Sequence, residues 1–238
     1  MTGGHLAAGR LTIARIWGIP ISVHVSWLLV FALVASSLAA GYFPERQPGW
    51  GAATRWVLGA LTSLAFFASV LVHELGHSRV ALRYGIPIRG ITLFVFGGVA
   101  QIGREPDSPG AEFRIAIAGP LTSLALAALF GGVGTVAGSM ALVSVPALWL
   151  ARINLFVALF NLLPGFPLDG GRVLRAAVWA WTGSFDRANR TAAASGEVLA
   201  LVLIGVGTLR AMGGDVAGGI WIALIGWFLH SAVVAGRA

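Results

Sequence analysis

The residues best placed for chemistry are His73, Glu74 and His77, which stand together in one apolar stretch. Histidines four residues apart lie on the same face of a helix, so both imidazoles can reach one metal ion. Glu74 directly follows the first histidine. That offset places its carboxylate beside the open position of the metal, where it can accept a proton from bound water. The alternative is a chance match on a core helix, but such polar groups are costly to bury unless they bind something.

A third candidate ligand is Asp169, which lies in the stretch Pro164-Gly165-Phe166-Pro167-Leu168-Asp169-Gly170-Gly171. A helix cannot continue through these prolines and glycines, so the backbone unwinds and Asp169 is free to turn inward. Two histidines and one carboxylate, with one position left open, form the catalytic arrangement of zinc. The alternative is a solvated aspartate in a turn. Because the chain has no cysteine, any metal must use histidine and carboxylate ligands.

The composition indicates a membrane protein. Hydrophobic residues make up 57% of the chain and charged residues only 11%, whereas about a quarter of a soluble protein is charged. The formal net charge is +7, and every basic residue is an arginine. The arginines flank apolar segments and do not form one patch, so they favour membrane flanks over nucleic acid binding.

The elements that must position these residues are predicted to be membrane spans. We expect an all-α membrane protein, a polytopic bundle of about six transmembrane helices with a membrane-embedded β-hairpin, forming a single domain over residues 1–238. The expected spans are about 27–43, 55–84, 115–130, 142–163, 191–209 and 216–234. Both histidines fall in the second span, below the membrane surface.

The expected hairpin covers residues 86–103. Pro87 and Gly90 break a helix, residues 91–96 are β-branched and aromatic, and Gly97-Gly98 favours a tight turn. Both faces of this segment are apolar, so we expect it to pack into the membrane domain.

The remaining segments are assigned from local patterns. We expect an interfacial strand at 17–26, a polar connector at 104–114, a glycine-rich turn after residue 130 and a short amphipathic helix at 173–181. His24 in the strand could be a fourth metal group, but a structural role is favoured. Arg152 and Glu197 lie within spans, and the sequence does not assign their roles.

The arginine distribution predicts the orientation of the chain. Residues 1–15 lack the pattern of a removable signal peptide, so we expect the N-terminus in the cytoplasm, and with six spans the C-terminus also. In that orientation twelve arginines are cytoplasmic, three are external and Arg152 lies within a span.

Several motifs together carry a resemblance to a known family. They are Val72 to His77, Leu93 to Ala100, Ala118-Gly119-Pro120, Asn161 to Pro164, and Leu168 to Gly171. The sequence resembles the site-2 protease family of intramembrane zinc metalloproteases, in its compact prokaryotic branch related to the protease that processes a sporulation sigma factor. The motifs cover Arg15 to about Trp181. Neither a PDZ-sized insertion nor the CBS domains common in that branch are found in this sequence.

The resemblance implies roles for the site residues. His73, His77 and Asp169 would bind one zinc ion per chain, Glu74 would be the general base and acid, and Asn161 would hold the substrate carbonyl or its oxyanion. The implied activity is regulated intramembrane proteolysis in the cytoplasmic membrane, with the active site nearer the cytoplasmic face.

The implied partners are the lipid bilayer and a single-span membrane substrate, such as an anti-sigma factor or a membrane-tethered transcription regulator. A homo-oligomer is possible, and nucleic acid is not expected. An unwound substrate segment needs new backbone partners, so we expect it to bind by strand addition along the hairpin from Ile91 to Ile102. Proline substitutions at residues 92–96 would test this expectation.

Two other functions remain open. A metal transporter would spread its ligands along a path through several helices. A catalytically silent zinc-binding scaffold or chaperone would most simply have lost Glu74, which this chain retains.

Overall fold

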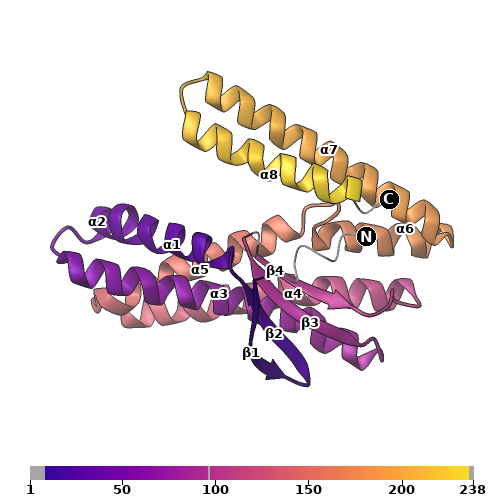
Figure 1. The fold of residues 1–238 in the computed structure, drawn as a ribbon, viewed down its shortest axis with the longest axis horizontal. Helices are drawn as coiled ribbons and strands as arrows, with labels where there is room; N and C mark the ends of the chain where they lie inside the picture. Colours follow the sequence, from indigo (N-terminus) through magenta and orange to yellow (C-terminus); the bar gives the residue numbers. More distant parts are fainter. Residues whose placement is uncertain (1–8, 96, 236–238) are drawn as a thin grey trace. The chain divides into compact units, whose positions relative to one another are not determined.

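The computed structural model describes residues 9–95 and 97–235 (Figure 1). Some expectations concern residues outside these ranges. They are those for the two chain ends, for Phe96 beside the hairpin turn, and for Arg237, one of the twelve arginines expected in the cytoplasm.

The described residues confirm the expected helical membrane architecture. Six helical segments are long and apolar enough to cross a membrane. They are Trp27–Arg46, Ala52–Arg83, Pro109–Ala137, Ala141–Asn161, Phe185–Met212 and Val216–Ala235. The first comprises α1 (Trp27–Ser37), a π-helical turn (Leu38–Tyr42) and α2 (Phe43–Arg46), and the others are α3, α4, α5, α7 and α8 in that order.

Contacts divide the chain into two compact units. The first comprises Met1–Glu105 and Leu121–Ala158, and the second Pro106–Pro120 and Leu159–Ala238. The division falls inside α4 and α5, so each of these helices contributes to both units.

The first unit pairs membrane helices with a four-stranded sheet of order β1-β2-β3-β4 (Figure 1). Its strands are β1 (Arg10–Ile16), β2 (Ile19–His24), β3 (Ile88–Phe94) and β4 (Gly97–Ile102). β2 and β3 are parallel, because α1 and α3 return the chain between them, and the other neighbours are antiparallel. α3 lies against β3 and β4. The hairpin is therefore confirmed, and it is part of a larger sheet.

The sequence pattern did not predict strand β1. Its side chains are mostly exposed, so it lacks the half-buried alternation that marks a strand. The expected strand at 17–26 is shorter in the structure, because Trp17 and Gly18 both have positive φ and form the turn from β1 to β2. Nδ1 of His24 lies within hydrogen-bond distance of the Ser26 hydroxyl, at 2.8 Å, and accepts a hydrogen bond from the Ser26 backbone amide at 3.2 Å.

Helix α4 corrects two further expectations. It begins at Pro109, so most of the expected polar connector is helical; Ser108 caps it by accepting a hydrogen bond from the Ala111 amide. It also continues to Ala137, so the glycines after residue 130 are helical and not a turn. Close packing against α5 explains one of these glycines, Gly134. A side chain at Gly134 would come within 2.8 Å of Leu148 on α5.

The second unit contains α6 (Asp169–Thr182), α7 and α8. α7 and α8 lie side by side (Figure 1) and approach closely, because small residues face each other along the pair. Gly207 packs on Ala223, and Gly226 packs on Ala200. α6 contains the expected amphipathic helix and begins earlier, at Asp169 itself.

Candidate metal centre

His73 and His77 form a buried pair on α3. The two side chains are 5% and 6% exposed, and their Nε2 atoms are 3.2 Å apart. With zinc–nitrogen bonds of about 2.0–2.1 Å and tetrahedral angles, two ligand nitrogens are separated by about 3.3 Å. The pair therefore has the spacing that tetrahedral zinc requires, and its residues fit this metal.

Ser123 on α4 orients the first imidazole. Its hydroxyl lies 2.9 Å from Nδ1 of His73, and both groups are buried. When Nδ1 carries the proton, it donates a hydrogen bond to the hydroxyl oxygen, and the lone pair of Nε2 is then free for a metal. Partners of this kind set the tautomer and the orientation of a ligating histidine.

A second buried contact supports the same turn of α3. The amide of Asn154 on α5 donates to the Ser69 hydroxyl at 3.3 Å and to the Leu150 carbonyl at 2.9 Å. Ser69 lies one helical turn before His73. Helix α3 is thus hydrogen-bonded to α4 at His73 and to α5 one turn earlier, at Ser69.

Glu74 is half-buried and faces strand β4. A Cβ atom built on Gly98 would lie 2.6 Å from Cγ of Glu74 and 3.1 Å from its Oε1. Only a glycine leaves the carboxylate where it is. β4 therefore passes directly beside the candidate general base.

This contact gives a first prediction. Replacing Gly98 with alanine should push the Glu74 side chain aside and lower substrate cleavage by about a hundredfold, because misplacement by about 1 Å can cost that much. The histidines are untouched, so zinc content should stay at the parental value. Cleavage rate and bound zinc are measured together.

The matched control is Gly132→Ala on α4, where an added Cβ meets nothing within 4 Å. Parental cleavage by Gly98→Ala, with normal folding, would show that the position of Glu74 does not depend on this glycine.

Asp169 is the first residue of α6, directly after the irregular segment 162–168. The two glycines that follow it let the backbone fold back on itself. A Cβ at Gly170 would collide with the carbonyl oxygens of Leu162 and Leu163, and one at Gly171 with the backbone of Gly165. The start of α6 is thus held by backbone packing, which explains the glycines after the aspartate.

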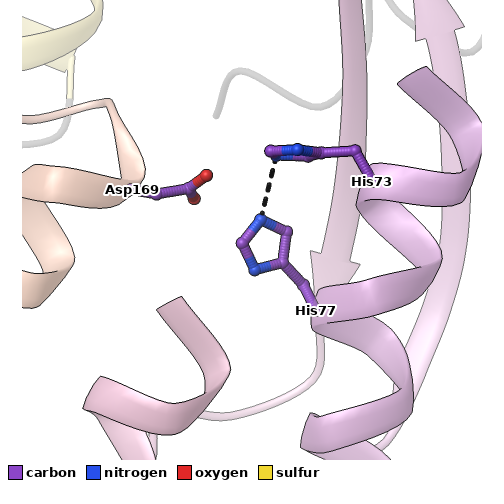
Figure 2. Close-up of side chains that lie close together, drawn as sticks. All are labelled: His73, His77 and Asp169. Atoms are coloured by element: carbon purple, nitrogen blue, oxygen red, sulfur yellow. Dashed lines mark hydrogen bonds between the residues drawn. The ribbon is translucent and has the colours of Figure 1, made fainter. Parts of the chain in front are cut away.

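The structure brings three of the expected site residues together. His73, His77 and Asp169 could hold a metal ion, since each offers one ligand atom and these atoms lie within 4.8 Å of one another (Figure 2). Asn161 is not in this group; it is the last residue of α5 and is half-buried.

Sequence reasoning missed Ser123, Asn154 and the role of Gly98. A hydroxyl and an amide within apolar segments were available signals for the first two, because such groups need partners when buried. Gly98 was assigned to a turn. In the structure it lies within β4, against Glu74.

Comparison with known proteins adds sequence and structural relatives. The sequence model of Peptidase family M50 matches residues 61–144 and 135–205. The chain is 46% identical over 225 residues to “Putative zinc metalloprotease Rip3” of Mycobacterium tuberculosis, covering 93% of this chain and 57% of that protein. It is 42% identical over 231 residues to “Putative zinc metalloprotease sll0528” of Synechocystis sp., covering 95% and 59%. The chain thus spans less than two thirds of the length of these relatives.

The structure is also similar to the solved structure of the site-2 protease from Methanocaldococcus jannaschii. The TM-score is 0.62 with 30% sequence identity, and the match covers 95% of this chain and 94% of the other.

Proposed function

Because the chain belongs to Peptidase family M50, the site-2 protease family, we propose that it is an intramembrane zinc metalloprotease that cleaves a membrane-anchored regulatory protein within or near its transmembrane segment. The observation that carries the proposal is the buried histidine pair, whose nitrogens are 3.2 Å apart, with a glutamate between them in sequence. His73, His77 and Asp169 are the proposed ligands. A single-span regulator such as an anti-sigma factor is the proposed substrate class.

The proposed reaction is hydrolysis of a peptide bond by water. A bound zinc ion would act as a Lewis acid, polarising the scissile carbonyl and lowering the pKa of a water molecule to about 7. Glu74 accepts one proton from the attacking water as the new carbon–oxygen bond forms. It then donates that proton to the amide nitrogen as the carbon–nitrogen bond breaks. Asn161 is proposed to hold the carbonyl oxygen of the substrate.

A reconstitution experiment separates this function from metal transport and from a silent scaffold. The protein is placed in liposomes with a tagged single-span substrate whose helix carries a Gly-Pro pair near its cytoplasmic end. A protease should convert the substrate into two fragments without moving zinc across the bilayer. Zinc uptake without fragments would favour the transporter, and neither activity would favour the scaffold.

We further propose that the substrate is presented as an added strand on β4. A transmembrane helix hides its carbonyls in its own hydrogen bonds, so the helix must unwind and find new backbone partners before it is cut. The sequence predicts these partners along the hairpin from Ile91 to Ile102. Its first strand, β3, already pairs with β2 and β4 on its two sides, so proline substitutions at 92–94 do not test an added strand. Among the described strands, β4 lies at one edge of this sheet, with β3 as its neighbour, and its Gly98 lies against Glu74.

Proline substitutions on β4 test this presentation, because proline cannot donate to a strand ladder. Proline placed singly at Val99, Ala100 and Gln101 should include at least one variant that loses cleavage by about tenfold or more, with parental zinc content and melting temperature. Ile13→Pro, at the register shift on β1 on the opposite edge of the sheet, is the control. Strand addition is wrong if every folded variant on β4 cleaves at the parental rate.

The orientation proposed for this multi-pass membrane protein places Gln47 outside and Arg187 in the cytoplasm. The chain contains no cysteine, so single cysteines can be introduced at these two sites without background labelling. An impermeant thiol reagent applied to intact cells should modify Gln47→Cys and leave Arg187→Cys unmodified. Labelling of Arg187→Cys alone would require the opposite orientation.

A further inference from the structure

A buried carboxylate near the start of α4 binds two arginines of α6. Glu112 is 0% exposed, and its Oε1 accepts hydrogen bonds from Nε of Arg172 at 3.0 Å and from Nη2 of Arg175 at 2.8 Å. Glu112 also lies in the first turn of α4, where the helix dipole favours a negative charge. All three residues belong to the second unit.

Arg175 joins this carboxylate to two further segments. Its guanidinium lies 5.1 Å from the ring centre of Phe166 and 5.0 Å from that of Phe185, and its Nη1 donates to Oδ1 of Asn189 at 3.3 Å. The side chain is nearly fully buried. It therefore connects α6 to α4, to the segment before α6 and to α7.

The two arginines lie on the same helix, α6, as the proposed metal ligand Asp169. Arg172 and Arg175 follow Asp169 by three and six residues, which is about 4.5 Å and 9 Å along the helix axis. A helix with two arginines bound to one carboxylate cannot rotate or slide without breaking a buried ion pair. Breaking such a pair leaves an uncompensated buried charge, which is strongly unfavourable.

From this geometry we propose that Glu112 is a positioning residue for the metal centre: through Arg172 and Arg175 it fixes the rotation and axial position of α6, and so the place of the Asp169 carboxylate. This inference rests on the proposed function, since it takes Asp169 as a zinc ligand. Apolar residues of similar volume would hold α4 and α6 together equally well. A shared carboxylate instead favours one helix register, as buried polar groups do in some helical assemblies.

The test measures metal binding directly. Zinc affinity is determined by chelator competition in detergent, and the visible absorption of the cobalt-substituted protein reports the ligand set. Glu112→Gln should raise the zinc Kd by about tenfold, the lower end of the effect of groups that orient ligands, and should alter the cobalt spectrum. Arg175→Lys keeps the charge but cannot make the hydrogen bonds to both Glu112 and Asn189 or the planar contacts with the two phenylalanine rings. Arg175→Lys should also raise the zinc Kd and alter the cobalt spectrum. It serves as the second variant if Glu112→Gln does not fold.

Two further variants make the outcome specific. Glu45→Gln removes an exposed carboxylate in the other unit and should leave zinc affinity and spectrum unchanged. Asp169→Ala should raise the zinc Kd far more than Glu112→Gln. If Asp169→Ala weakens zinc binding while folded Glu112→Gln and Arg175→Lys bind zinc with parental affinity and spectrum, the positioning role is refuted and the ligand set stands. If Asp169→Ala itself binds zinc normally, the ligand set and the positioning role both fail.

Discussion

Replacing Glu74 with glutamine should lower peptide-bond cleavage by at least about a thousandfold while zinc stays bound at one ion per chain. The amide is nearly isosteric with the carboxylate, but it cannot accept the proton of the attacking water or deliver it to the leaving nitrogen. General acid–base groups typically contribute 10²–10⁴-fold, or about 3 to 5 kcal/mol of transition-state stabilisation. Fragment formation from the tagged single-span substrate and zinc content are measured on the same preparation.

Glu45→Gln is the matched control for this variant, because it makes the same chemical change at an exposed site. It should cleave at the parental rate. Full activity in Glu74→Gln would remove the glutamate from the mechanism, and loss of zinc in that variant would mean that Glu74 is a ligand.

The second large effect is expected at the proposed metal ligands. His77→Ala and Asp169→Ala should each lose stoichiometric zinc and all detectable cleavage. The histidine variant removes one of two nitrogens that are 3.2 Å apart, and a catalytic zinc site has only three protein ligands to lose. Both losses are measured by metal analysis after purification and by the same fragment assay.

Ser123→Ala provides an intermediate case, because it leaves all three ligands in place and removes only the partner of His73 Nδ1. Its zinc affinity should fall by about 10- to 100-fold. A histidine or aspartate variant that retained stoichiometric zinc would exclude that residue from the ligand set.

The candidate metal ligands could be predicted because their signal is local. His73 and His77 are one turn apart on a helix, and Asp169 directly follows a segment whose prolines and glycines interrupt the helix. The six membrane helices follow equally from composition and length. In each case the physical constraint acts on neighbours in the sequence.

Groups that position the site could not be predicted in this way. Ser123 lies 50 residues from His73, and Glu112 lies 60 and 63 residues from its two arginines. Their roles depend on which helices pack together, and no local pattern encodes that. The place of β4 beside Glu74 likewise depends on pairing across the sheet, so Gly98 was assigned to a turn.

Metal titration of the purified protein tests whether a zinc ion bound by this chain is needed to cut a membrane-embedded peptide bond. The protein is stripped with a chelator, zinc is added back stepwise, and the masses of the substrate fragments are determined at each step. We expect no fragments from the stripped protein, restored cleavage that saturates at one zinc per chain, and a cut within or near the transmembrane segment. Equal cleavage with and without zinc, or a cut confined to a soluble part of the substrate, would contradict this expectation.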